Sequence, residues 1–466
     1  MAGKHIRLDS RFNVISAFWV PDATDEAVYT GTLTVDEDGI TFTTAPKYDR
    51  RLSGTPRFRL DGSEPARRPA LQGFTEDGLC TLCQLVEIGH PGRTDFELDQ
   101  SITATNYRAS VCVTGMHLGG LDDRCIKSAH YTFAGLSEWL PGAISEAREN
   151  DCVVIKVPID ARDYLALSLR ESRIQVSLKV FSELTNSEKD GARRSRSVAY
   201  VDIETPSTEC LSWYLDIGNR LENLFSLLTG TSLALETMFV YRGKERGHVI
   251  AKRNNYAKRF DLLECVRCTP SQLANSISIW LSESQGFRAV ENLALGVVRK
   301  GKLFIQTEFL SLAQALEGFH RVTAPSTAVD KNMTRQIRKK IAALLKTENV
   351  DADIAKRICT SMSHANDPTF ALRLTELCSR ISSSLLSRMG IFPEQFVSDV
   401  VTNRNYYTHA GSSARIGKKS KPISETQLFF LNQKMRALLR GVILLHLGIP
   451  EDQISELIVR EATRWR

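Results

Sequence analysis

The chain has 466 residues, of which 42% are hydrophobic and 24% are charged, as is usual for folded globular proteins. This length is too great for one ordinary core and predicts about two or three domains. No stretch approaches the roughly 18 apolar residues that span a bilayer, and residues 1–7 lack the apolar region of a secretory signal. We therefore expect a cytoplasmic protein without membrane contact.

The charge is unevenly distributed along the chain. Of its 60 Lys and Arg and 54 Asp and Glu residues, residues 301–466 hold 24 and 15, a net charge of +9. The first 300 residues keep 36 and 39, a net charge of −3. Contacts of Lys and Arg with phosphates release counterions, so the basic last third favours a polyanionic ligand. Charge alone leaves a solvated helical surface as the alternative.

Short alternating segments predict a β-rich region from about residue 18 to residue 201. Residues 29–35 and 40–43 alternate between apolar and polar side chains, and residues 36–39 between them form a turn signal. Further strands are expected at 79–88, 107–113, 152–157 and 174–180, and an exposed loop at 186–196. Short strands with Gly and Asp turns indicate a sandwich or a barrel-like sheet.

Mixed elements are predicted next along the chain. A helix over residues 211–229 has an apolar face and is followed by Gly230, which suits a helix C-cap. A strand at 235–241 and a helix at 271–281 follow, and the composition changes around 285–301.

The last third of the chain predicts five helices with apolar residues three and four positions apart. The first covers about 303–322, and the last starts at Ser424, where Ser424 and Gln427 form a capping box. The other three are a helix marked by Ile337 to Leu345, one that runs from Leu374 to near Gly390, and one that begins near Pro393. Such helices form a bundle.

These elements predict a multidomain α+β protein. We assign residues 1–205 to a β-rich, sandwich or barrel-like domain with accessory helices. Residues 206–300 form a mixed connecting region, and residues 301–466 form an all-α bundle.

Arg404 and His409 are the residues to which we assign chemistry. They lie on the helix that begins near Pro393, about 7.5 Å apart along its axis at 1.5 Å per residue. When RNA is cleaved by its own 2′-hydroxyl, the enzyme needs a proton carrier and a cation for the charge on phosphorus. Histidine suits the first role and arginine, with its bidentate donors, the second. This chemistry would need neither a metal nor another cofactor. On spacing alone, a histidine that caps or packs at the helix end is the alternative.

The pattern also resembles a known family. An Arg followed by Asn405 and then by His409, on a late helix of a basic bundle, is similar to the R-x4-6-H signature of HEPN ribonucleases. Residues 309–321, Phe-Leu-Ser-Leu-Ala-Gln-Ala-Leu-Glu-Gly-Phe-His-Arg, resemble the first bundle helix of the ApeA-type HEPN branch. Residues 31–33 and 74–78 fit the β-rich N-terminal domain of the same architecture, so the resemblance covers most of the chain.

The resemblance implies a bacterial anti-phage protein that cleaves RNA, with tRNA as one candidate, and stops the growth of the infected cell. Arg404, His409 and Asn405 are then the catalytic residues. HEPN domains pair so that two Arg/His sets face one cleft, which implies a homodimer or a larger homo-oligomer. The N-terminal domain is expected to restrain the nuclease until a phage component, such as a phage protein, binds. The alternative is a non-catalytic module that binds nucleic acid or protein.

Residues near the Arg/His pair are candidate supporting groups. Tyr406 is a candidate for stacking on an unpaired base, whereas Tyr407 is expected to pack in the core. Glu317 and His320 are candidates for support of the site, with a purely structural role as the alternative. The loop after His409 carries basic residues for phosphate contacts, or alternatively for a solvated surface: Arg415, Lys418, Lys419 and Lys421.

Ten cysteines include two C-x-x-C pairs, and without an export signal free thiols are expected. Cys80 and Cys83 lie in a predicted strand, where alternation points the two sulfurs to opposite faces. Cys265 and Cys268 lie near a turn and suit zinc better, but a four-thiolate site would need both pairs to meet. We expect no metal, with Cys265 and Cys268 as the only candidates for structural zinc.

Overall fold

The protein is described by a computed structural model with two compact units, Met1–Leu262 and Leu263–Arg466, which we treat separately. The structure describes residues 12–21, 28–36, 38–45, 47–50, 67–89, 92–95, 100–140, 145–149, 152–156, 162–169, 173–186, 193–251, 265–283, 285–299, 303–324, 331–361, 367–408 and 422–464. The expected connecting region, 206–300, contributes elements to both units, and our three-part domain boundaries remain a prediction. None of the described helices is long and apolar enough to cross a membrane.

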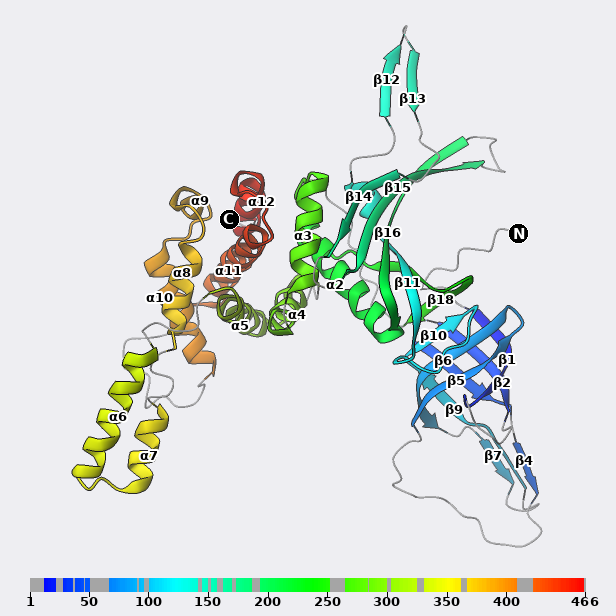
Figure 1. Cartoon of the computed structure of the whole chain (residues 1–466), viewed down its shortest axis with the longest axis horizontal. Coiled ribbons are helices and arrows are strands. Elements are labelled where there is room, and N and C mark those ends of the chain that lie inside the picture. The colour runs from blue at the N-terminus through cyan, green and yellow to red at the C-terminus, as the bar shows by residue number, and fades with distance from the viewer. Residues whose placement is uncertain are drawn as a thin grey trace. The chain divides into compact units, whose positions relative to one another are not determined.

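A closed antiparallel barrel forms the start of the first unit (Figure 1). Its strands pair in a ring because β6 pairs with both β5 and β9. The turn between β2 and β3 is stabilised by Asp36, whose Oδ1 accepts hydrogen bonds from the backbone N–H groups of Asp38 (2.8 Å) and Gly39 (3.2 Å). The ring consists of β1 (Phe12–Trp19), β2 (Tyr29–Asp36), β3 (Gly39–Thr44), β5 (Arg67–Thr75), β6 (Gly78–Gly89) and β9 (Asn106–Ala109).

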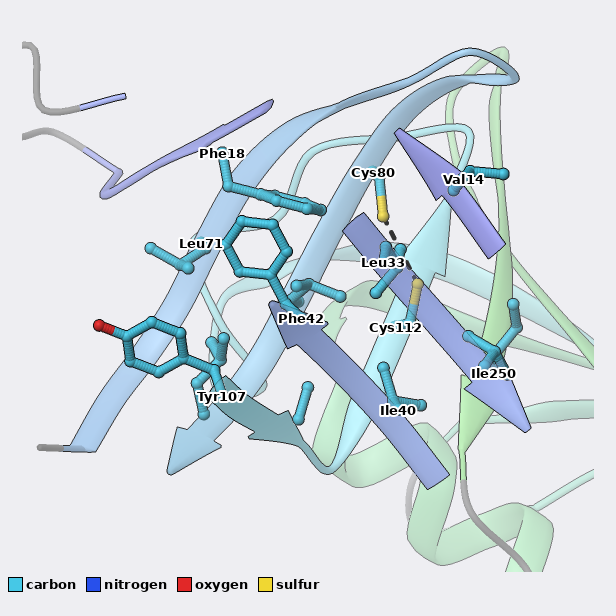
Figure 2. Close-up of a cluster of buried hydrophobic side chains, with 14 residues drawn as sticks. Val14, Phe18, Leu33, Ile40, Phe42, Leu71, Cys80, Tyr107, Cys112 and Ile250 are labelled. Carbon is cyan, nitrogen blue, oxygen red and sulfur yellow. Dashed lines mark hydrogen bonds between the residues drawn. The ribbon is translucent and has the colours of Figure 1, made fainter. Parts of the chain in front are cut away.

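The barrel is filled by apolar side chains that alternate along these strands (Figure 2). Phe18 and Phe42 meet edge to face, with ring centroids 4.9 Å apart. Cys80 points into this core, where its sulfur lies 3.5 Å from that of Cys112. Cys83 is fully buried but lies outside that cluster, as the alternation of a strand predicts.

The sheet continues beyond the barrel through β10 (Val111–Thr114), which pairs with β6 and β18. This extension carries α2 (Leu211–Thr229) on one face, where the Tyr131 hydroxyl donates a hydrogen bond to the Tyr214 carbonyl at 2.8 Å. Its strands, in spatial order from β10, are β18 (Glu245–Ala251), β17 (Leu235–Arg242), β11 (Arg124–Phe133), β16 (Arg193–Cys210), β15 (Gln175–Asn186) and β14 (Arg162–Ser168).

Smaller elements complete the first unit. These are α1 (Leu136–Trp139), the pair β12 (Ser145–Glu149) and β13 (Cys152–Lys156), and the group β4 (Lys47–Arg50), β7 (Gly92–Asp95) and β8 (Gln100–Thr103).

Two local predictions in this unit were wrong. The expected loop at 186–196 is partly strand, because Glu183–Asn186 pairs with Arg193–Arg196 at the end of the β15–β16 hairpin. Cross-strand backbone pairing overrides the polar composition that suggested a loop. The expected strand at 107–113 is divided into β9 and β10, which both pair with β6 but have β3 and β18, respectively, as their other neighbours.

The second unit is wholly helical in its described residues (Figure 1). Asn275 and Ser276 of α3 both donate to the Leu447 carbonyl at the end of α11, at 3.2 Å each. The helices are α3 (Pro270–Ser282), α4 (Gln285–Arg299), α5 (Ile305–Thr323), α6 (Lys331–Thr347), α7 (Ala352–Ser361), α8 (Phe370–Cys378), α9 (Ser383–Arg388), α10 (Pro393–Thr408), α11 (Glu425–His446) and α12 (Glu451–Thr463).

The helix expected from Leu374 to Gly390 is two helices, α8 and α9. Ser382 caps the second one, because its hydroxyl accepts a hydrogen bond from the Leu385 N–H at 3.3 Å. The apolar spacing runs through the break, since Leu374, Ile381 and Leu385 are all buried. Periodicity alone therefore concealed the interruption, and α7 and α12 were not predicted. The fold class itself, a β-rich barrel-like region followed by a helical bundle, is confirmed.

Candidate functional site

Helix α10 presents Arg404 beside α5 and α8, which pack against α10 and each other. Phe396, Val397, Val400 and Asn403 form the buried side of α10. Arg404 follows directly, with 37% of its side chain exposed. The apolar face of α10 thus fixes the backbone under Arg404 while part of the guanidinium remains open to a ligand.

Glu317 of α5 lies between two arginines. Its Oε2 is 3.7 Å from Nη2 of Arg404, and its Oε1 accepts a hydrogen bond from Nη2 of Arg321 at 2.8 Å. The three side chains carry a net charge of +1, so Glu317 orients Arg404 without neutralising the group. The Phe370 ring faces the same guanidinium, 5.6 Å from its central carbon, which adds a cation–π contact.

Asn403 ties the end of α10 to the start of α11. It is 1% exposed, and its Nδ2 donates to the Asp399 carbonyl at 2.7 Å while its Oδ1 accepts from the Ile423 N–H at 3.2 Å. Ile423 directly precedes Ser424, whose capping box begins α11 as predicted. The chain therefore leaves α10 and enters α11 close to the same buried amide.

His320 belongs to a separate, buried polar cluster between α5 and α8. Its Nε2 is hydrogen-bonded to Glu376, and Arg373 donates from Nη1 to its Nδ1 at 3.1 Å. Because a guanidinium only donates, Nδ1 must be the acceptor, which assigns the proton to Nε2 of a neutral ring. Arg373 itself is held by the Pro368 carbonyl, which accepts from Nε at 3.0 Å.

The surroundings of His320 favour the neutral form. Burial of the ring lowers its pKa below the ordinary 6.5; Glu376 acts in the opposite direction, and Arg373 and Arg380 add to the lowering. The side chain is 0% exposed, and both ring nitrogens are engaged. This geometry supports a purely structural role for His320. Of the two candidate supporting residues, Glu317 is the one that contacts Arg404.

The other predicted site residues are placed as follows. Asn405 is exposed, and Tyr406 is 36% exposed. Tyr407 packs edge-on against Phe309 at 5.9 Å between centroids, as expected for a core contact, and burial raises its pKa. Outside the described residues lie His409 and the basic loop residues Arg415, Lys418, Lys419 and Lys421.

The cysteines expected as zinc candidates were also located. Cys265 and Cys268 are both partly buried, and burial raises the pKa of Cys268 to about 12, which disfavours the thiolate that zinc requires. Burial likewise raises the pKa of Cys83 to about 12. In the described part of the chain, no group of three or more His, Cys, Asp or Glu side chains is arranged to hold a metal ion.

The sequence did not point to Arg321, Arg373, Glu376 or Asn403. Arg321 could have been found, since it follows Glu317 by four residues and therefore shares its helix face. Arg373 and Glu376 lie more than fifty positions from His320 in the sequence, so only the packing of α8 on α5 brings them together.

The lowered pKa of His320 predicts a pH-dependent stability of the helical unit. Below the unfolded pKa of about 6.5 the unfolded chain binds the proton while the folded chain resists it, so unfolding becomes easier. We expect the free energy of unfolding to fall between pH 7.5 and pH 5.5. The H320Q variant, whose amide can both donate and accept but does not titrate, should lose this contribution. Denaturant melts of both proteins across this pH range measure it.

H130Q is the matched control, because it removes a histidine from the first unit. It should keep the pH dependence of the helical unit, which is followed by far-UV circular dichroism because the described residues of that unit are helical. If wild type and H320Q showed the same pH dependence, the neutral assignment of His320 would be wrong.

Comparison with known proteins places these two units in described families. A model of ApeA N-terminal domain 1 matches residues 14–267, and a model of Apea-like HEPN matches residues 310–453. The second match includes Glu317, His320 and Arg404. No curated protein and no solved structure gave a match. The chain therefore belongs to the ApeA family, in which an ApeA N-terminal domain precedes an Apea-like HEPN domain.

Proposed function

We propose that this protein is a conditional endoribonuclease of bacterial anti-phage defence that cleaves RNA with Arg404 and His409. HEPN domains are in general ribonucleases, and the ApeA family suggests an anti-phage nuclease. The observation that carries the proposal is the partly exposed guanidinium of Arg404, which Glu317 orients within the HEPN match. A bundle that served only as a scaffold would have no need of this arrangement.

The proposed step uses the substrate's own nucleophile. A histidine accepts the proton of the 2′-hydroxyl, whose oxygen then forms a bond to phosphorus. The bond from phosphorus to the 5′-oxygen breaks, and a second proton donor protonates that oxygen. The products are a 2′,3′-cyclic phosphate and a 5′-hydroxyl, with no redox change. Arg404 offers donors to the phosphoryl oxygens, on which charge increases in the transition state.

Two proton carriers are needed at once, and each chain supplies one His409. Pairing of two HEPN domains about a twofold axis would bring two Arg404/His409 sets to one substrate. HEPN domains typically dimerise, which supports a homodimer or a larger homo-oligomer. Asn405 and Tyr406, both exposed on the last turn of α10, would then contact the RNA beside the scissile phosphate.

The basic residues after His409 and the N-terminal domain would determine which RNA is cleaved and when the nuclease is active. The basic residues Arg415, Lys418, Lys419 and Lys421 would bind phosphates of the substrate, for which tRNA is one candidate. The N-terminal domain would hold the nuclease inactive until a phage component, such as a phage protein, binds to it. Cleavage of essential RNA would then stop growth of the infected cell in the cytoplasm.

Substitution of either catalytic residue tests the site. R404A and H409A should each lower RNA cleavage by at least about a hundredfold, because each removes a transition-state interaction. R404A should keep a melting temperature close to that of the wild type, since the Arg404 side chain is 37% exposed, and the melting temperature of H409A is measured alongside it. Cleavage of total RNA and of tRNA by purified protein measures the effect, with and without phage lysate.

R388A is the matched control, because Arg388 is also an exposed arginine of the helical unit but pairs with Glu456 of α12 rather than with Glu317. It should cleave as the wild type does. Wild-type cleavage should also persist in EDTA and leave 2′,3′-cyclic phosphate ends. Strict dependence on a divalent ion, or salt-dependent RNA binding without products, would favour a different nuclease or a non-catalytic binding module.

Glu317 should act as a positioning residue for Arg404. E317A is expected to lower kcat by up to about a hundredfold with little change in KM, because a catalytic group displaced by about 1 Å loses that much. E317Q keeps a hydrogen-bonding group at the same place and should recover most of the activity. Single-turnover cleavage with all three proteins measures this. Equal loss in E317A and E317Q would show instead that the negative charge itself is required, and no loss would remove Glu317 from the site.

A further inference from the structure

A cavity of about 760 Å³ lies in the first unit, on the sheet formed by β14, β15, β16, β11 and β17. This volume is in the range of sites that bind small molecules or a few side chains. The cavity is lined from all five strands, and it is separate from the residues of the nuclease proposal. It therefore requires its own explanation.

The two faces of this sheet differ in chemistry. Side chains on one face, such as Tyr131, Leu178 and Val201, are fully buried, and α2 packs against β11, β16 and β17 (Figure 1). The intervening residues on the same strands point to the other face, where charged and polar side chains such as Lys179, Asp202 and Ser177 lie beside aromatic rings such as Phe181 and Phe239. An ordinary solvated face would carry independent side chains, whereas here they form one connected network.

Asp202 is the centre of this network. Its Oδ1 accepts a hydrogen bond from Nδ1 of His130 at 2.9 Å, and its Oδ2 accepts one from Nζ of Lys179 at 3.0 Å. Burial would raise the pKa of Asp202, but the bonds from His130 and Lys179 hold it below its ordinary value. Because a carboxylate only accepts, Nδ1 of His130 is the donor in this contact.

Aromatic rings complete the lining. Tyr200 lies against His130, with ring centroids 4.2 Å apart and planes at 31°, and its ring is 5.9 Å from Nζ of Lys179. Tyr241 lines the cavity from β17. Tyrosine faces attract organic cations, and the surrounding strands hold these rings in place.

The charges of the residues that line the cavity determine whether it favours a cationic or an anionic ligand. Lys179 and Asp202 balance each other through their ion pair, so the Glu204 carboxylate is the remaining acidic group among the described lining residues. Phosphates and nucleotides would be repelled. A cation with several N–H donors could use the Glu204 carboxylate and the Tyr241 ring together.

We propose that this cavity binds an organic cation of the guanidinium or ammonium type, either free or as the Arg or Lys side chain of a polypeptide. The site goes beyond the proposed nuclease activity and does not depend on it. It would give the N-terminal domain a ligand of defined chemistry. A polypeptide source would match a protein trigger, and a free cation would make this domain a sensor of small molecules.

Calorimetric titration of the full-length protein tests the proposal with four probes. These are methylguanidine, Nα-acetyl-arginine amide, its neutral citrulline counterpart and AMP. Both guanidinium probes should bind, and the citrulline compound should bind at least about tenfold more weakly, since it has a similar shape but no charge. Tighter binding of the arginine amide than of methylguanidine would indicate a polypeptide ligand, and equal binding a free cation.

Two variants are expected to change the affinity for guanidinium probes in opposite directions. E204Q should weaken guanidinium binding by about tenfold, as expected for one lost charged hydrogen bond. K179M removes a like charge and frees an oxygen of Asp202, so it should strengthen binding. E209Q, the same substitution as E204Q on the same strand but outside the lining, should bind as the wild type does.

The proposal would be overturned by equal binding of the arginine and citrulline probes, by no binding of either guanidinium at millimolar concentration, or by preferred binding of AMP. Unchanged affinity in both E204Q and K179M would also contradict it. RNA cleavage by E204Q without any trigger should equal that of the wild type, so failure here would leave the nuclease proposal untouched.

Discussion

The contact of Glu317 with Arg321 and Arg404 is the interaction on which the candidate site depends. An arginine on the exposed side of a helix has many rotamers, and ordering it costs conformational entropy. Glu317 restricts Arg404 from α5 and Phe370 restricts it from α8. Because Arg321 takes the other carboxylate oxygen, the group keeps its net positive charge. A partly exposed, pre-oriented cation of this kind is what a transferring phosphoryl group requires.

This arrangement needs the helices beneath it to be fixed. The buried His320, Arg373 and Glu376 cluster connects α5 to α8, and Asn403 connects α10 to the residue before α11. His320, Arg373 and Asn403 are buried and hydrogen-bonded, whereas Glu376 is partly exposed, so a displaced helix would leave buried donors or acceptors unsatisfied. Polar contacts thus set the positions of the helices, whereas the apolar residues at three- and four-residue spacing supply most of the burial.

Many of the helices could be predicted from the sequence because local signals mark them, whereas contacts between distant residues could not. Apolar periodicity, Gly230 and the capping box at Ser424 are local signals, and α2, α5, α10 and α11 appear where they indicated. The break between α8 and α9 was missed because burial continues through it. Contacts between residues far apart in the sequence could not be predicted. Arg373 contacts His320 only because α8 packs on α5. His130, Lys179 and Asp202 are neighbours only because of the register of their strands. The roles of Arg404, Asn405 and His409 remain predictions.

The two units differ in chemistry: the helical unit carries an oriented arginine, and the β-rich unit carries a cavity for which we propose a cationic ligand. The central claim is that the first of these cleaves RNA, and sequencing of RNA ends tests it most directly. Cells that express the wild type during phage infection should accumulate new 2′,3′-cyclic phosphate ends at defined positions, and cells that express H409A at the same level should not. Identical ends in both cultures would contradict the account.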